Sequence, residues 1–346
     1  MLIQVYLPSQ DSTLDYLLIK TSSVIMKITI KKILFILLAF SASMLTAQQL
    51  PQLTINALNP YFSNPAYGGT TPYIEASLSS RYQWLSSDFR GKTPITNYLS
   101  FYAPYNRILG HDNEHSKKKI RSWNTIGGSF LYDQAAANTN VNAQLSFAHN
   151  VPLTKSIRMS SALSVGIQQF TTDNSDFILA DPVDQVLNEV NRKKVLDVTA
   201  SLWWYSDIFF GGISVKQALN QLEFGTGDNT IPLNRHYTTS LGAHFGLTHS
   251  SDMIIYYNNR IVQNVPISHE LSSILIVNHR YWTGLSVRYK ESVSLILGTI
   301  VAKRFDFTYA YDIPTGSLGN NFGSHEIILE YKLVVDDKIP CPDQFW

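Results

Sequence analysis

From about residue 70 onward, apolar and polar residues alternate one by one along most of the chain. In residues 74–84, Ile74, Ala76 and Leu78 fall on one face of an extended segment, and Glu75 and Ser77 fall on the other. This alternation is typical of β-strands, in which successive side chains point to opposite sides. Fourteen segments of about 8–13 residues show it, close to the roughly 9–11 that a tilted membrane strand needs. They cover 74–84, 96–104, 125–133, 141–149, 158–170, 196–205, 208–216, 236–247, 253–260, 270–277, 281–289, 293–302, 305–312 and 325–333.

The connection lengths distinguish a membrane barrel from a soluble β-sandwich, whose strands alternate in the same way. The even-numbered connections are mostly tight, as at Ser206-Asp207 and Lys303-Arg304, and short periplasmic turns with long outer loops are typical of outer-membrane barrels. Two connections depart from the rule, because 105–124 is long and 290–292 is short. We predict an all-β fold, a transmembrane antiparallel β-barrel of about fourteen strands over residues 73–335. The longer odd-numbered connections are 85–95, 134–140, 171–195, 217–235, 261–269 and 313–324.

Aromatic residues gather near the ends of the predicted strands. Tyr and Trp favour the membrane–water boundary, because the ring is apolar and its tip is polar. Lipid offers no hydrogen-bond partners, so a spanning sheet must pair all its backbone groups, which closure into a barrel achieves. We therefore expect a boundary belt formed by Tyr82, Trp84, Tyr102, Trp203, Trp204, Tyr205, Tyr256, Tyr257, Tyr281, Trp282, Tyr309 and Tyr311.

Composition agrees with this fold and excludes some partners. Charged residues make up 15% of the chain, against about 25% in an average soluble domain. The net charge of +1 gives no indication of nucleic acid as a partner. Cys341 is the only cysteine, so an internal disulfide is excluded.

Residues 26–47 are predicted to be a cleaved secretory signal. Lys27, Lys31 and Lys32 precede the apolar run 33–40, and Ala47 provides a small residue before Gln48. The run is too short for a membrane-spanning helix. We interpret residues 1–25 as an upstream over-extension of the reading frame, with a genuine extended leader as the alternative. Residues 48–72 are expected to form an irregular periplasmic lead-in and 336–346 a short tail, on a protein of the cell outer membrane.

No pattern predicts catalysis, a cofactor or a metal, so we predict a protein that is not an enzyme. A GxSxG nucleophile motif is lacking. His111 and His115 lie four residues apart, but a solvated polar loop explains them more simply than a metal site. The aspartates between Asp173 and Asp184 could bind calcium, yet their spacing is not that of an EF-hand. The glycine pairs 127–128 and 211–212 lie inside predicted strands and indicate close approach or bulging.

Two groups of motifs resemble one known family. Near the start stands Asn64-Pro65-Ala66-Tyr67-Gly68-Gly69, followed by Arg81-Tyr82-Gln83-Trp84. Near the end stand Tyr311-Asp312 and Gly323-Ser324-His325-Glu326-Ile327, before Cys341-Pro342. Together they resemble the PorP/SprF family of type IX secretion-associated outer-membrane proteins over residues 49–346. The first motif departs from the family's NPAYAG by one small residue.

The resemblance implies a barrel needed for export or surface display of particular large proteins, often gliding adhesins. It implies outer-membrane lipid, a secreted or surface cargo protein, and type IX secretion components in the periplasm and outer membrane as partners. It brings no catalytic residues. The motif prolines and glycines are expected to fix how the chain enters the first strand. His325 and Glu326 would face the lumen or a partner, or form a hydrogen-bonded pair at a strand end.

A general porin or lipid-type transport channel is the alternative function, because a barrel of this size has room for a lumen.

Overall fold

The computed structural model describes residues 52–71, 73–84, 93–104, 122–173, 191–219, 234–263, 265–302, 304–315 and 322–334. Residues 1–25, the expected signal 26–47 and the expected tail 336–346 lie outside the described residues. The same holds for His111, His115, and most of the aspartate-rich loop after Asp173. No helix of the described ranges is long and apolar enough to cross a membrane.

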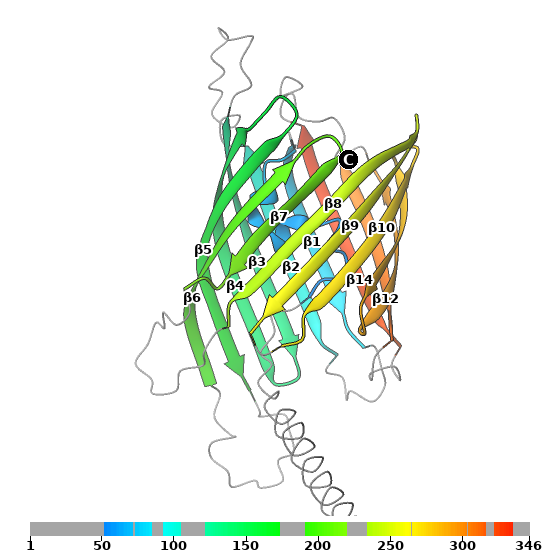
Figure 1. Cartoon of the computed structure of the whole chain (residues 1–346). Helices are drawn as coiled ribbons and strands as arrows, with labels where there is room; N and C mark the ends of the chain where they lie inside the picture. Colours follow the sequence, from blue (N-terminus) through cyan, green and yellow to red (C-terminus); the bar gives the residue numbers. More distant parts are fainter. Residues whose placement is uncertain are drawn as a thin grey trace, which may run out of the picture. The chain divides into compact units, whose positions relative to one another are not determined.

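Fourteen antiparallel strands form one closed barrel, in which β14 pairs with β1 (Figure 1). The prediction of an all-β barrel of about fourteen strands is confirmed, and each predicted segment coincides with one strand to within five residues at either end. The strands are β1 (Tyr73–Tyr82), β2 (Ile95–Pro104), β3 (Trp123–Ala135), β4 (Asn138–Pro152), β5 (Arg158–Thr172), β6 (Asn191–Tyr205), β7 (Phe209–Lys216), β8 (His236–Thr248), β9 (Ser251–Val262), β10 (Ser268–Val277), β11 (Tyr281–Arg288), β12 (Ser292–Ile300), β13 (Phe305–Pro314) and β14 (Ser324–Val334).

The barrel has two rims, which we name by the first strand. The near rim is where β1 begins at Tyr73 and β14 ends at Val334, and the far rim is where β1 ends and β14 begins. The even-numbered connections lie at the near rim and the odd-numbered ones at the far rim. The prediction of a long connection over 134–140 is wrong, because β3 and β4 meet in the two-residue turn Ala136-Ala137. Ala136 has a positive φ of 53°, which allows so tight a turn.

The alternation places apolar side chains outside and polar ones inside. Leu329 is 47% exposed on the outer face, whereas its neighbour Ile328 and the polar Glu326 point inward and are each 1% exposed. Hydrocarbon is the solvent that suits such an outer face in an outer-membrane barrel. Other exposed apolar side chains of this face are Leu78, Phe101, Phe130, Leu145, Ile167, Leu241, Leu285 and Leu297.

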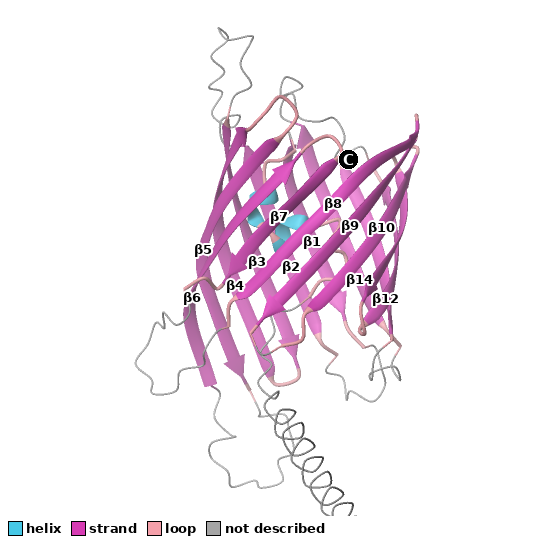
Figure 2. Cartoon of the chain, viewed as in Figure 1, coloured by secondary structure: helices cyan, strands magenta, loops and turns pink. Residues whose placement is uncertain are grey.

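The segment before β1 differs from the expected periplasmic lead-in. Residues 52–71 lie inside the ring of strands, and most of them are buried (Figure 2). They include the short α-helix α2 (Pro60–Ser63) and the 3-10 helix η1 (Pro65–Tyr67). The segment takes this position because its polar groups find partners on the inward faces of many strands, as described below.

Five of the twelve aromatics expected at the membrane boundary are instead buried inside the barrel. They are Tyr102, Trp203, Tyr205, Tyr256 and Trp282. The physical reason is that the lumen is filled, so inward positions near the segment 52–71 gain more from ring packing than from water. Tyr82 and Tyr281 do lie on the outer face, where they are 42% and 50% exposed.

Candidate functional site

Residues 52–71, which we call the plug, cross the lumen from the far rim to the near rim. At the far end, the Thr54 amide donates a hydrogen bond to Oε2 of Glu326 on β14 (2.5 Å). At the near end, Nε1 of Trp123 on β3 donates to the carbonyl oxygen of Gly69 (2.9 Å). Between them, the Asn56 side chain reaches Glu270 on β10 (2.8 Å). The plug is therefore attached to the wall on several sides of the ring.

A group of buried ionisable side chains surrounds the start of the plug. Arg81 of β1 and Asp312 of β13 form an ion pair of 2.8 Å, and each is at least nine-tenths buried. Arg288 lies 3.4 Å from Glu270, which makes a second buried pair. We call these residues, together with Glu326, the far-half charge cluster. Buried charges are tolerated when they are paired and hydrogen-bonded, as these are.

The charge cluster also binds backbone groups and a hydroxyl of the plug. Arg81 donates to the carbonyl of Gln52, and Arg288 donates to that of Leu53 (3.0 Å). The Thr54 hydroxyl donates to Oδ2 of Asp312 (2.7 Å). Hydrogen bonds with an ionised partner are shorter and stronger than neutral ones. The cluster therefore fixes residues 52–54 against both strands of the β1–β14 seam and against β11 and β13.

Asn64, the first residue of the NPAYGG motif, joins the plug to two neighbouring strands. Its Oδ1 accepts from the Ala66 amide (3.0 Å), which caps η1. Its Nδ2 donates to the carbonyls of Leu202 on β6 (2.9 Å) and Ile213 on β7 (3.2 Å). The Ala66 amide is shared with the Ser201 hydroxyl (3.1 Å). One amide side chain thus shapes the plug and positions it on the wall.

At the near rim, the plug contacts the wall through aromatic rings instead of charged groups. Tyr67 meets Trp203 edge-on, with ring centroids 5.5 Å apart, and Tyr102 at 6.2 Å. Tyr61 lies 5.1 Å from Tyr102. Edge-to-face contacts of this kind are favoured beyond the burial of apolar area alone. We call the group the near-half aromatic cluster, and it comprises Tyr61, Tyr67, Tyr102, Trp203, Tyr205, Phe210 and Tyr256.

Glycines in the wall make room for the plug. A Cβ on Gly127 would lie 2.5 Å from the Tyr61 hydroxyl, and one on Gly212 would lie 2.5 Å from Nδ2 of Asn64. Gly69 has a φ of +81°, and a Cβ there would lie 1.9 Å from Oγ1 of Thr125. The expectation that the glycine pairs mark close approach is confirmed. The plug approaches Gly127 and Gly212, whereas the wall side chains Phe101 and Leu241 approach Gly128 and Gly211.

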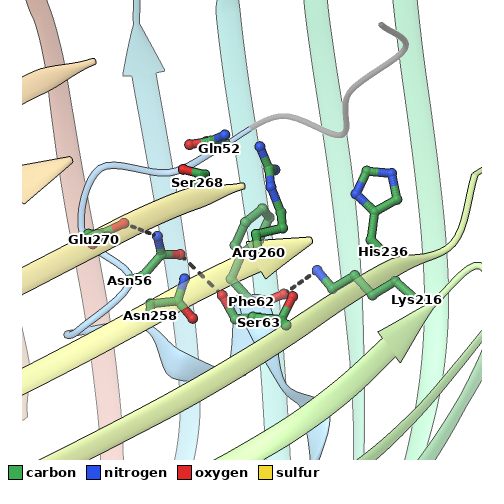
Figure 3. Close-up of a pocket in the computed structure, with 11 residues that line it drawn as sticks. Gln52, Asn56, Phe62, Ser63, Lys216, His236, Asn258, Arg260, Ser268 and Glu270 are labelled. Carbon is green, nitrogen blue, oxygen red and sulfur yellow. Dashed lines mark hydrogen bonds between the residues drawn. The ribbon is translucent and has the colours of Figure 1, made fainter. Parts of the chain in front are cut away.

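A small pocket remains between the plug and the far half of the wall (Figure 3). Lys216, His236 and Arg260 line one part of it, and Glu270 lines another part, where Asn56 binds it. Lys216 donates to the Phe62 carbonyl and lies 4.4 Å above the Phe62 ring. His236 is 2% exposed, and its Nδ1 has no hydrogen-bond partner among the described residues. The far half of the lumen is thus polar, with basic groups at this side.

The structure brings most of the predicted motif residues together. Asn64 through Gly69 form the near end of the plug, while Arg81 and Glu326 bind its far end. Gln83 and Trp84 follow β1 at the far rim, where the Trp84 amide donates to the Ser324 hydroxyl (3.3 Å). These assignments as functional residues stay predictions, but the motifs share one structural role in holding the plug and the seam strands.

His325 and Glu326 do not form the pair considered from the sequence, because they point to opposite faces of β14. Glu326 faces the lumen and accepts from Thr54 and from the Ser79 hydroxyl (3.0 Å). Nδ1 of His325 lies on the outer face, 2.7 Å from the Tyr309 hydroxyl. Gly323, just before the strand, has a φ of +78°, and a Cβ there would lie 2.4 Å from the Asp312 carbonyl. This glycine lets the chain turn tightly into β14.

Sequence reasoning missed Glu270 and Arg288 as members of the site, and did not assign Asp312 a role. Glu270 and Arg288 are each the single Asp, Glu, Lys or Arg of an otherwise alternating strand, and Asp312 is one of the two inward aspartates of β13. A charged residue on the lumen-facing side of a strand indicates a member of an interior site. This indication can be used only once it is known which side of the strand faces the lumen.

In the part of the chain that the structure describes, the groups of the site are engaged with one another and with the plug. Within the described ranges, no group of three or more His, Cys, Asp or Glu side chains could hold a metal ion. The carboxylates of the charge cluster are occupied by arginines and by the plug. The predictions of no catalytic, cofactor or metal residue therefore stay predictions, and what the geometry offers is binding and positioning.

Comparisons with known proteins give one matching family and several similar solved structures. A profile of the family described as "Type IX secretion system membrane protein PorP/SprF" matches residues 45–331. No curated protein matches significantly. Solved structures that are similar include a mutant Rh. blastica porin (6% identity, 75% of this chain and 99% of that chain, TM-score 0.32). Others are the KdgM porin (6%, 75% and 99%, 0.35) and BamA from Haemophilus ducreyi lacking POTRA domains 1-3 (10%, 75% and 70%, 0.39).

Proposed function

The chain belongs to the type IX secretion system membrane protein family PorP/SprF, and on this premise we propose that it is a non-enzymatic accessory of type IX secretion. In this role the barrel supports export or surface display of particular proteins, of the gliding-adhesin type, by binding the cargo or docking the secretion machinery. The family is one of membrane proteins of a secretion system, not a family of enzymes.

The observation that carries this proposal over a porin is the occupied lumen. The plug is hydrogen-bonded to β3, β6, β7, β10, β11, β13 and β14, and its residues 53–59 are all buried. A diffusive channel needs a continuous aqueous path through its strands, whereas a docking protein needs only a rigid body in the membrane. A filled lumen therefore favours a role exercised at the rims.

Deleting the gene and cataloguing the surface and secreted proteins tests the proposal. We expect a small set of large surface proteins to be lost from the cell exterior, while general outer-membrane composition is retained. Complementation with the intact chain should restore that set. If no surface or secreted protein changes in abundance, the proposal fails.

The porin or lipid-channel alternative is tested by conductance in a planar bilayer. We expect the purified chain to show no steady solute-dependent conductance, because residues 52–71 occupy the lumen. A variant lacking residues 52–71 serves as the matched control and should conduct if it folds. Steady conductance of the intact chain at the level of that variant would favour the porin function instead.

We further propose that the near rim faces the periplasm and the far rim faces the cell exterior, following export through a cleaved signal. The tight turns at the near rim support this orientation. In a Cys341→Ser background, Lys290→Cys lies in a far-rim turn and Ser250→Cys in a near-rim turn. A membrane-impermeant maleimide should label only Lys290→Cys in intact cells. Labelling of Ser250→Cys alone would reverse the orientation.

A further inference from the structure

The lengths of β6 and β7 differ, and this leaves part of β6 with one unpaired side. β6 pairs with β5 along all fifteen of its residues, from Asn191 to Tyr205. Its pairing with β7 covers only Ala200–Tyr205. Beyond that, the Ala218 amide donates to the Val198 carbonyl (2.8 Å). Among the described residues, no other backbone group pairs with the β7 side of residues 192–198, which we call the β6 edge.

The backbone direction of the β6 edge follows from that one contact. The Val198 carbonyl points toward β7, and alternate residues of a strand direct their N–H and C=O groups to the same side. Arg192, Lys194 and Leu196 therefore present both groups on the open side. The edge spans roughly 20 Å at about 3.3 Å per residue, which is enough for a strand of average length.

The edge is held in an extended form by the wall behind it. β5 is paired with β4 from Asn138 to Pro152, so β4, β5 and β6 project together beyond the end of β7 at the far rim (Figure 1). The outward and rim positions of this projection are polar, as at Thr139, Gln169 and Thr171. This composition suits water rather than lipid. The edge is thus a pre-ordered template outside the apolar part of the barrel.

The charge of the edge selects what can pair with it. Arg192 and Lys194 are exposed and Lys193 is half-buried, which gives three consecutive cations. Lys216, the last residue of β7, does not add to this charge, because its side chain faces the lumen, where it donates to the Phe62 carbonyl. Asp197 faces inward and is bound by Asn142 and Gln144. Basic residues repel a second copy of the same edge and attract an acidic strand.

We propose that the β6 edge binds an acidic, extended segment of a partner protein by β-strand addition. The segment's backbone would pair with Arg192, Lys194 and Leu196, while its carboxylates would face Arg192–Lys194. Main-chain hydrogen bonds give the affinity in this mode of recognition, and side chains give the selectivity. The inference rests on the proposed function in one respect only, namely that the partner is a protein of the secretion pathway.

The test uses the purified full chain in nanodiscs and a fluorescent probe peptide of about ten residues with alternating Thr and Glu. A peptide with Lys in place of Glu is its matched control. We expect the acidic peptide to bind, to bind more weakly as salt rises, and to protect the amides of Arg192, Lys194 and Leu196 from hydrogen exchange. The Lys peptide should neither bind nor protect these amides.

Two variants separate backbone pairing from side-chain contact. Leu196→Pro removes one edge N–H but no donor of the β5–β6 ladder, and should weaken peptide binding by roughly fivefold, the worth of about one hydrogen bond. Leu196→Ala should bind like the original chain. If Leu196→Pro does not fold, the double variant Lys193→Glu/Lys194→Glu decides, because it should lose the acidic peptide and bind the Lys peptide.

The proposal is overturned if the acidic peptide gives no protection of the three amides, or if both charge types bind equally. It is also overturned if those amides are already protected in the free chain, which would assign the edge to this chain's own connection after β7. The peptide assay uses the isolated chain and is therefore independent of the deletion experiment. If the peptide binds but deletion leaves the surface proteome unchanged, the proposed function is contradicted and the binding role of the β6 edge is retained.

Discussion

The two halves of the lumen hold the same plug by different forces. In the far half, Arg81 and Arg288 pair with buried carboxylates and bind plug carbonyls. In the near half, Tyr67 packs against Trp203 and Tyr102. The charged side chains of that half, Asp306, Glu330 and Lys332, pair with one another within the wall. Ionic contacts depend on exact partners, whereas ring packing depends on filled volume. The comparison shows that one end of the plug is specified by charge and the other by shape.

The near half should be the more sensitive to lost volume. Trp203→Ala would leave a cavity beside Tyr67 and Phe210, and we expect it to lower the free energy of unfolding by about 3–5 kcal/mol. Urea unfolding in detergent micelles measures this. Trp204→Ala is the matched control, because Trp204 has the opposite orientation on β6. Equal losses in the two variants would contradict the assignment of Trp203 to the packed interior.

The far half should be the more sensitive to lost charge. Arg81→Met leaves Asp312 without its ion-pair partner and Glu326 without a nearby cation, and should cost about 3–4 kcal/mol of unfolding free energy. Arg81→Lys keeps the charge and should cost less. The same urea titration compares them. A loss below about 1 kcal/mol for Arg81→Met would mean that charge pairing does not hold this half.

The lipid-facing and lumen-facing sides of β14 can also be compared. Leu329→Arg puts a charge on the outer face, and should cost about 2–4 kcal/mol if it lies at the bilayer midplane. Glu330→Gln, on the next inward position, should cost far less. The fraction that stays folded and migrates as a compact band in unheated gel samples reports both. Equal folding yields would refute the facing of β14.

The smallest effect is expected where the two halves meet. Asn64→Ala removes the cap of η1 and two hydrogen bonds to the wall, and should cost about 1–2 kcal/mol. Asn64→Ser keeps a capping oxygen without burying a charge and should lose less. Limited chymotrypsin digestion after Tyr61 and Tyr67 measures release of the plug. Unchanged cleavage in Asn64→Ala would show that Asn64 does not position it.

The strands were predictable because alternation is a local property. In the pairs Leu329/Glu330 and Leu78/Ser79, the apolar residue marks the outer face and the polar residue the inner face, whichever strand lies alongside. The same parity could have corrected the aromatic belt, since Trp203 shares a face with Ser201 and not with Leu202. An assignment by residue type ignores which face of the strand each ring occupies, and it therefore misplaces five of the rings.

The plug could not be predicted in the same way. Residues 52–71 have no period of two or 3.6, and their contacts lie far away in sequence, as between Thr54 and Glu326. The motif resemblance marked Asn64–Gly69 and Glu326 as special without showing that they belong to one assembly. Long-range pairing of irregular backbone leaves no local pattern, so only the fold reveals it.

The contacts of the plug with β1 and β14 restrict the order in which this protein can assemble. Residues 52–54 are bound by Arg81 on the first strand and by Glu326 on the last, which are neighbours across the seam. If the barrel closed while it was empty, residues 52–71 would afterwards have to thread through the closed ring of strands. This threading is avoided if β1 and β14 pair around a plug that is already in place. Pairing of the final hairpin then closes the barrel and fixes the plug in the same step.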